Sequence, residues 1–206
     1  MGNDMNINIM IPVLNEEKSL LEKIYILTDY LNSTELKEKY RITIIDNGSN
    51  DKTPQLCMRL SERLEGIVYF IRLEHRGVGL ALRAGIKNNP FDIVGYMDLD
   101  LATDIRHLRQ VYREFADKGQ NIVVGSRLLK GSRVIGRSGF RNFTSKSLNM
   151  ILKFYLKVIF TDAMCGFKFY KKDIAEKLLQ ECSSNNGWFY CAEMLIGSEW
   201  LGIAIK

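Results

Sequence analysis

Two aspartates stand one residue apart at the end of a strongly apolar stretch. Phe91–Asp98 is predicted to be a buried strand, and Asp100 follows it in the sequence "GYMDLDLATD". Residues i and i+2 of an extended chain point the same way, so the carboxylates of Asp98 and Asp100 should enter one site. Two neighbouring carboxylates repel each other, and each is costly to desolvate. A divalent cation removes both difficulties, because Mg²⁺ and Mn²⁺ prefer carboxylate oxygens. We therefore predict a Mg²⁺ or Mn²⁺ site held by this pair.

Other polar clusters follow apolar strand-like segments in the same manner. Five strands are predicted, at Ile7–Val13, Arg41–Asp46, Gly66–Leu73, Phe91–Asp98 and Asn121–Ser126. Four of them end in polar residues, at Asn15–Glu16, Asp46–Asp51, Glu74–Gly79 and Asp98–Asp100. Ligands bind beyond the carboxyl ends of parallel strands, so these clusters should share one edge of a sheet.

Helical patterns separate the strands and predict how the clusters are positioned. Asn15 is expected to cap a helix with apolar residues at helical spacing, namely Leu20, Ile24, Leu27 and Leu31. Thr53 is expected to cap the next helix, and further helices are predicted at Val78–Lys87 and from Ile105 to near Gly119. This alternation predicts an α/β fold: a mostly parallel central sheet with helices on both faces.

The regular alternation of predicted strands and helices ends after Ser126. A long helix is predicted at Ser147–Phe160, with a polar stripe formed by Lys146, Asn149, Lys153 and Lys157. A short strand in "DAMCGFKFY" and two further helices follow. The final "LGIAIK" starts a strand, so we expect a single domain over residues 1–206 that is truncated at its C-terminus.

Composition narrows the class of protein. The chain is 46% hydrophobic and 26% charged, which is typical of a soluble globular protein, and it contains no transmembrane-length apolar run and no signal peptide. Its four cysteines have no metal-like or redox-like spacing. The segment from Lys118 to Thr161 contains nine Lys or Arg residues and no acid, which predicts an anionic partner.

Several of these segments together resemble one family. The chain resembles inverting family 2 glycosyltransferases of the GT-A (Rossmann-like) fold, most of all the dolichyl-phosphate or polyprenyl-phosphate glucosyltransferases. The similarity covers nearly the whole chain and rests on segments in the family's order: "IPVLNEE", "IIDNGSNDKT", "HRGVGLALRAG", "MDLDLATD", "VVGSR", "RSGFRNFTSKSLNMILK", "TDAMCGFKFY" and "WFYCAEML".

The resemblance implies roles for individual residues. Residues 1–126 would form the nucleotide-sugar half and residues 127–206 the acceptor half. Asp98 would lie by the ribose and diphosphate of the donor, and Asp100 would bind the metal. Donor contacts would come from Pro12, Asn15, Glu16, Asp46, Arg76 and Gly77, while Arg127, Arg137 and Arg141 would face phosphates. Three positions depart from the family pattern: Asn47 for Asp, Val78 for Lys and Cys191 for Asp.

The basic segment favours a particular acceptor. A hydroxyl acceptor would need a general base, for which Asp162 and Glu193 are the candidates. A lipid monophosphate is already anionic near neutral pH and needs cations instead. The acid-free segment supplies cations, and the apolar face of Ser147–Phe160 could lie on a bilayer. We therefore expect a UDP-glucose-like donor and a polyprenyl-phosphate acceptor, for a protein peripheral at the cytoplasmic membrane face.

Three alternatives remain open. A family 2 transferase that extends a glycan hydroxyl, as in capsule, wall or lipopolysaccharide synthesis, would depend on Asp162 or Glu193. A nucleotidyltransferase usually has a glycine-rich phosphate loop after its first strand, which "PVLNEE" lacks. A non-catalytic module that binds nucleotides or anions would leave the polar strand ends without a purpose. Nucleic acid is not an expected partner, because the aromatic residues near the basic segment recur like core residues.

Overall fold

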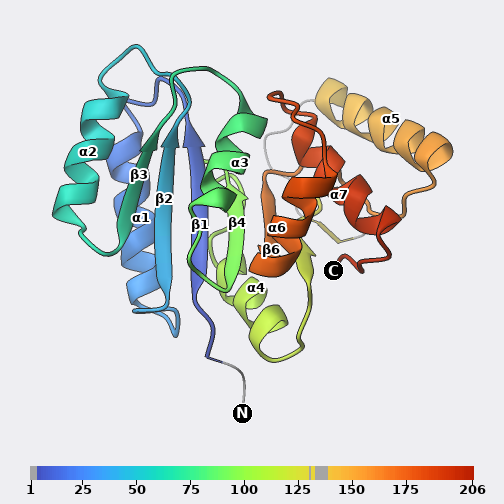
Figure 1. Cartoon of the computed structure of the whole chain (residues 1–206), viewed down its shortest axis with the longest axis horizontal. Coiled ribbons are helices and arrows are strands. Elements are labelled where there is room, and N and C mark those ends of the chain that lie inside the picture. The colour runs from blue at the N-terminus through green and yellow to red at the C-terminus, as the bar shows by residue number, and fades with distance from the viewer. Residues whose placement is uncertain (1–3, 130, 133–138) are drawn as a thin grey trace.

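The computed structural model describes residues 4–129, 131–132 and 139–206, with side chains omitted for residues 139–143 (Figure 1). Strands and helices alternate through most of the chain. In order they are β1 Ile7–Val13, α1 Leu20–Asn32, β2 Tyr40–Asp46, α2 Thr53–Arg63, β3 Val68–Arg72, α3 Val78–Lys87, β4 Ile93–Met97, α4 His107–Ala116, β5 Ile122–Val124, α5 Gly139–Leu156, β6 Phe167–Lys171, α6 Lys172–Glu181 and α7 Tyr190–Trp200.

One six-stranded sheet organises the described part of the chain, in the order β3-β2-β1-β4-β6-β5. Strands β1, β2, β3 and β4 run parallel, so their carboxyl ends meet at the upper edge in Figure 1. Strand β6 is antiparallel to both of its neighbours, β4 and β5. The predicted α/β class and mostly parallel sheet are therefore confirmed. The C-terminal segment adds a single parallel bridge between Ile205 and Ile122.

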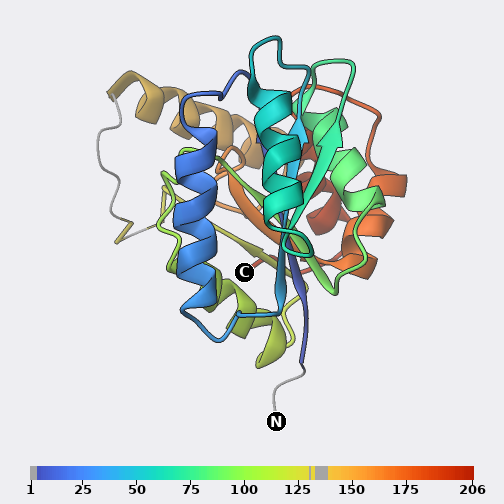
Figure 2. The same cartoon turned by 90° about the vertical axis from the view of Figure 1, so that its left-hand side faces the viewer.

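Helices cover both faces of the sheet, as predicted (Figures 1 and 2). Buried residues of α1, α2 and α4 pack with the β1 side chains of Ile7, Ile9 and Ile11 on one face. Buried residues of α3, α6 and α7 pack on the other face, around Met10 and Tyr96. Because both faces are covered, strand residues of either parity are buried, which explains the continuous apolar runs in the sequence.

Two predicted helix caps are wrong. Helix α1 begins at Leu20, five residues after Asn15, whose φ of 55° is left-handed. The Asn15 side chain instead accepts a hydrogen bond from the Asn50 backbone N–H, at 3.0 Å, and so joins two loops. The Thr53 hydroxyl likewise accepts from the Glu16 N–H, at 2.7 Å, instead of capping its own helix. Both side chains therefore connect the ends of β1 and β2, which local sequence patterns could not indicate.

The predicted polar stripe on the long helix is wrong at one position. Asn149 is buried, and its side-chain oxygen accepts a hydrogen bond from the Ala163 N–H at 2.9 Å. Lys146 and Lys153 are exposed, as predicted, and so is Lys157 just beyond the helix. Within the described ranges, no helix has the length and apolar content needed to cross a bilayer.

Candidate active site

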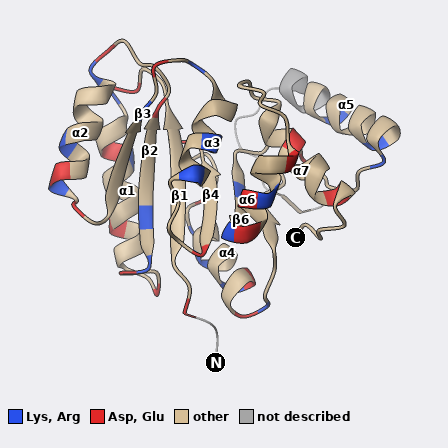
Figure 3. Cartoon of the chain, in the orientation of Figure 1, with Lys and Arg blue, Asp and Glu red and all other residues tan. Residues whose placement is uncertain are grey.

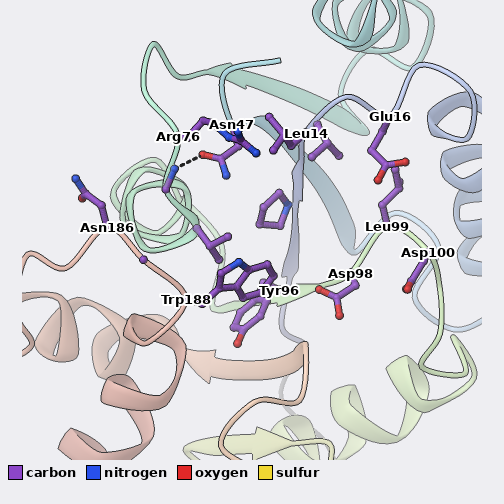
Figure 4. A pocket seen from close by; sticks show the side chains of 15 residues that line it. Leu14, Glu16, Asn47, Arg76, Tyr96, Asp98, Leu99, Asp100, Asn186 and Trp188 are labelled. Carbon is purple, nitrogen blue, oxygen red and sulfur yellow. Dashed lines mark hydrogen bonds between the residues drawn. The ribbon is translucent and has the colours of Figure 1, made fainter. Parts of the chain in front are cut away.

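A cavity of about 490 Å³ opens at the carboxyl edge of the parallel strands (Figure 4). The ends of β1, β2 and β4 and the start of α3 form most of its wall, and the segment before α7 closes one side. Its lining residues are Pro12, Val13, Leu14, Glu16, Asn47, Arg76, Gly77, Val78, Tyr96, Asp98, Leu99, Asp100, Asn186, Gly187 and Trp188.

The two aspartates lie in this wall, as their spacing predicts. Asp98 and Asp100 flank the buried side chain of Leu99, and Asp100 also accepts a hydrogen bond from the Ala102 N–H at 2.9 Å. Asp98 is open toward the cavity and surrounded by protein on its other sides. This partial desolvation, reinforced by the Asp100 carboxylate, raises the pKa of Asp98 to about 6. The pair therefore concentrates negative charge that a bound cation would offset.

A glycine fixes the position of Asp98 from behind. Gly166 lies in the loop before β6, and a Cβ atom built on it would collide with the Asp98 carboxylate. Only glycine permits this close approach. The antiparallel insertion of β6 beside β4 brings Gly166 to the site from far along the chain.

The β1 and β2 loops support the wall through side-chain to backbone hydrogen bonds. The Asn15 N–H donates to the Ser49 hydroxyl at 2.8 Å. Asn47, where the resembled family has Asp, accepts from the Gly77 N–H at 2.7 Å. Its amide oxygen is therefore engaged by the glycine-rich loop, as the dashed line in Figure 4 marks.

The glycines of the α3 loop serve a contact within the protein. A Cβ atom on Gly79 would collide with the Asn185 carbonyl oxygen and with the Tyr190 side chain. The Gly79 N–H donates to the Asn186 carbonyl at 2.9 Å. The start of α3 is thereby attached to the segment that carries Asn186 and Trp188 into the cavity wall. This contact joins the two halves of the chain, and local sequence patterns do not indicate it.

Predicted site residues fall into three groups. Six line the cavity: Pro12, Glu16, Arg76, Gly77, Asp98 and Asp100. Five lie outside its wall: Asn15, Asp46, Arg127, Asp162 and Glu193. Arg137 lies outside the described residues, and so does the side chain of Arg141.

Asp46 is completely buried next to the cavity. One carboxylate oxygen accepts from the Ser49 N–H at 3.1 Å. The other has no hydrogen-bond partner and lies 3.9 Å from the Arg72 Nε. An unsatisfied buried carboxylate oxygen is costly, so this atom has unused capacity to accept a hydrogen bond.

Asp162 and Arg127 form an ion pair in which the Asp162 carboxylate is buried and the Arg127 guanidinium is partly exposed. The Arg127 guanidinium donates to both carboxylate oxygens, at 2.8 Å from Nε and 3.0 Å from Nη2, and the backbone N–H groups of Arg127 and Met164 donate as well. Burial alone would raise the pKa of Asp162, but these donors outweigh it and the pKa is lowered. The carboxylate is thus fully engaged.

Glu193 lies away from the cavity wall, on the first turn of α7. Its carboxylate accepts from the Ser183 N–H at 2.6 Å and from the Ser183 hydroxyl at 2.8 Å. Neither of the two predicted bases therefore presents a free carboxylate to the cavity.

Several residues of the wall were not among the predicted site residues. Tyr96 and Leu99 belong to the same strand end as the aspartates, and the strand's alternation could have indicated Tyr96. Trp188 stands in a segment that carries the family resemblance, and it is 57% exposed although it is a large aromatic residue. Asn186 has no comparable sequence signal.

Comparisons with known proteins agree with this geometry. The sequence profile described as "Glycosyl transferase family 2" matches residues 8–179. The chain is 25% identical to glycosyltransferase AglD of Haloferax volcanii, and the match covers 98% of this chain and 32% of that protein. It is 26% identical to dolichyl-phosphate beta-glucosyltransferase ALG5A of Trichomonas vaginalis, and that match covers 97% of this chain and 63% of the relative. It therefore spans less than two thirds of these relatives.

A solved structure shares the fold. Glucosyl-3-phosphoglycerate synthase of Mycobacterium tuberculosis, in complex with Mn²⁺, UDP-glucose and phosphoglyceric acid, aligns with a TM-score of 0.69 at 18% identity, over 98% of this chain and 68% of that one. The fold is thus of the GT-A type. With the profile match over most of the sequence, the chain belongs to glycosyl transferase family 2.

Proposed function

We propose that this domain transfers a sugar from a nucleotide-diphosphate sugar, with UDP-glucose as the first candidate, to the phosphate of a polyprenyl lipid at a membrane surface. The observation that carries the choice of acceptor is the state of the two predicted bases. Asp162 is bound on both oxygens by Arg127, and Glu193 is bound by Ser183. A hydroxyl acceptor needs a free base, whereas a phosphate does not.

The donor would occupy the cavity at the carboxyl edge. Pro12 and Leu14 offer apolar contacts to its nucleoside, and Arg76 offers a positive charge to its diphosphate. The unsatisfied oxygen of the buried Asp46 carboxylate could accept a hydrogen bond from a base N–H group. The name of the Trichomonas relative and the UDP-glucose complex of the structural neighbour support this donor.

The residues present fit a divalent metal ion. Asp98 and Asp100 would hold it, because both line one wall of the cavity, and the pKa of Asp98 is raised first by burial and then by the neighbouring Asp100 carboxylate. Among the described residues, no group of three or more His, Cys, Asp or Glu side chains is arranged to hold a metal alone. Two carboxylates leave the remaining positions to phosphate oxygens and water. A bound Mn²⁺ or Mg²⁺ would stabilise negative charge on the departing diphosphate.

The chain's own residues account for the rest of the reaction. The acceptor phosphate oxygen attacks the anomeric carbon, and the bond from that carbon to the diphosphate breaks with inversion. No proton has to be removed, because the second pKa of a phosphate monoester is about 6. Arg76 in the wall and the partly exposed Arg127, whose charge acts on Asp98, would contribute positive charge near the phosphates.

Helix α5 supports a membrane-bound acceptor. It lies on the same upper side of the molecule as the strand ends, and its charged side chains are Lys or Arg only (Figures 1 and 3). Four large apolar side chains stand out from it and from the turn that follows: Phe154 (77% exposed), Tyr155 (74%), Ile159 (81%) and Met150 (67%). A cluster of this size with neighbouring lysines matches an anionic lipid surface.

One assay tests the proposed transfer. The protein is offered UDP-glucose and a short polyprenyl phosphate, with Mn²⁺ or with EDTA, and lipid-linked glucose is measured. We expect transfer with Mn²⁺, and a loss of at least about a hundredfold in Asp100→Ala because removing a preorganised charge-stabilising group has effects of this size. Asp117→Ala is the matched control, since Asp117 is exposed beyond the end of α4. Transfer to a glycan hydroxyl instead of the lipid phosphate would overturn the choice of acceptor.

A vesicle assay tests the membrane surface separately. Wild-type protein should co-sediment with vesicles that contain phosphatidylserine and much less with pure phosphatidylcholine. Phe154→Ser should lower that binding about tenfold by removing apolar area. Met58→Ser is the control, because Met58 is a 55% exposed apolar residue on α2. Equal losses in both variants would contradict a specific role for α5.

A further inference from the structure

A lysine in strand β6 is completely buried. Lys168 is 0% exposed, and its Nζ lies 2.8 Å from the Tyr96 hydroxyl and 2.9 Å from each of the Ala163 and Cys165 carbonyl oxygens. The nearby buried acid, Asp162, is paired with Arg127, and the described residues give Lys168 no carboxylate at ion-pair distance. Lysine is almost never fully buried without such a partner, so this one requires a reason.

The hydrogen-bond inventory fits a charged ammonium. The two carbonyl oxygens can only accept hydrogen bonds. The Tyr96 hydroxyl, whose own proton can point to the neighbouring Cys191 sulfur, accepts the third N–H of Lys168. Three acceptors need three N–H donors, which an ammonium has and a neutral amine lacks. Burial lowers the pKa of Lys168, and the fields of Asp162 and Asp98 oppose that shift.

This charge lies under the floor of the cavity. Lys168 is the register partner of Tyr96 in the antiparallel pair of β6 and β4. Tyr96 lines the cavity, and Asp98 follows it by two residues, on the same side of an extended strand (Figure 4). The residue on the other side of Tyr96 is Cys191, a neutral thiol at the start of α7. The positive charge is therefore not compensated locally and acts toward the cavity.

We propose that Lys168 is a positioning residue whose buried ammonium offsets, through Tyr96 and from beneath the cavity floor, the negative charge of Asp98 and of a nucleotide diphosphate. This inference rests on the proposed function, because it assumes that a diphosphate occupies the cavity. It adds a charged residue that touches neither substrate nor metal. The competing explanation is purely structural: Lys168 would only hold the loop that carries Ala163 and Cys165.

Two binding titrations on Lys168→Met separate these explanations. If the charge of Lys168 matters, the affinities for UDP and for Mn²⁺ should change in opposite directions. A lost positive charge weakens the binding of an anion and strengthens the binding of a cation nearby. UDP binding in EDTA should weaken about fivefold, measured by calorimetry. Mn²⁺ binding without nucleotide should tighten about fivefold, measured from the electron paramagnetic resonance signal of free Mn²⁺. A loosened loop would instead weaken both.

Control variants separate the loss of the Lys168 charge from a loss of structure. Cys191→Ser keeps a neutral acceptor for the Tyr96 hydroxyl, so both affinities should stay within about twofold of wild type. Thermal unfolding of each variant is recorded in parallel, and Lys168→Gln, which retains two N–H donors, replaces the Met variant if that variant does not fold. Changes of the same sign, or no change, overturn the role of Lys168. Failure of the wild-type protein to bind UDP with or without Mn²⁺ would overturn the proposed function itself.

Discussion

The two halves of the chain contribute to the cavity in different ways. In residues 1–126, the groups that face the cavity stand on loops at the ends of parallel strands, and single hydrogen bonds such as Asn47 to Gly77 hold them. In residues 127–206, Asn186, Gly187 and Trp188 line one side of the cavity, and the other groups that act on the site are hidden behind its wall. Asp162 and Lys168 are completely buried, and Gly166 touches Asp98 from behind. The first half presents chemical groups, and the second half fixes their position and local charge.

This difference predicts where the protein is most sensitive. Loop side chains that face water can adjust when a neighbour changes, whereas a buried charge cannot lose its partner without a large energetic cost. Substitutions in the second half should therefore damage the site although they contact no ligand. The following predictions test that asymmetry, beginning with the largest expected effect.

The ion pair of Arg127 and Asp162 should dominate stability. Arg127→Met leaves the fully buried Asp162 carboxylate with only backbone donors, so the free energy of unfolding should fall by about 3 kcal/mol, measured by urea denaturation. Adding Asp162→Asn to that variant should restore most of the loss. Arg106→Met breaks an exposed pair with Asp104 and should cost less than about 1 kcal/mol. Equal costs in the two Met variants would refute the asymmetry.

The close contact between Gly166 and Asp98 should have a large effect on activity. Gly166→Ala introduces a Cβ atom where the Asp98 carboxylate lies, and a displacement of that group should lower glucosyl transfer about a hundredfold. Gly125→Ala is the matched control, because its nearest contact would be the Cys165 sulfur at 3.3 Å and can be relieved by a small shift. Circular dichroism establishes that both variants are folded. Normal transfer by Gly166→Ala would show that the contact with Gly166 is not needed to position Asp98.

The smallest effect concerns pH. The pKa of Asp98 is about 6 in the folded protein, against about 3.9 for an unfolded chain. Between these values the folded state binds more protons, so this group's contribution to stability is most favourable near pH 4 and is lost as pH rises through 6. In EDTA, the free energy of unfolding of the wild type should therefore fall by about 1 kcal/mol between pH 4 and 7, relative to that of Asp98→Asn. This value is modest because solvent screens the open side of Asp98. Urea unfolding of both proteins at each pH measures this difference. A difference that is independent of pH would contradict it.

The sequence predicted the first half of the fold well, for a physical reason. Four parallel strands buried on both faces produce continuous apolar runs, and their polar ends mark the sheet edge without any knowledge of pairing. Five of the cavity residues stand in the polar clusters that this pattern marks: Glu16, Arg76, Gly77, Asp98 and Asp100. What could not be found were the hydrogen bonds between loops, such as that of Asn15 with Asn50, because they join residues that are distant in sequence.

The second half could not be predicted in the same way. The segment Phe167–Lys171 alternates like a half-exposed strand, which would place Lys168 in solvent, yet β6 is inserted between β4 and β5 and covered on both faces. Asn149 was assigned to a polar stripe for the same reason and is buried. Strand order and helix docking depend on the whole chain, so local periodicity carries no information about them. Asn149 was therefore assigned to the wrong side, whereas Lys146 and Lys153 are exposed as predicted.

The late position of β6 in the sequence has a consequence for synthesis. When the first 126 residues have left the ribosome, both aspartates already exist, but neither Gly166 nor the wall formed by Asn186 and Trp188 has been made. The nascent chain at that stage has no closed cavity in which a nucleotide could lodge. The wall that would hold the proposed donor is thus complete only once translation has passed Trp188.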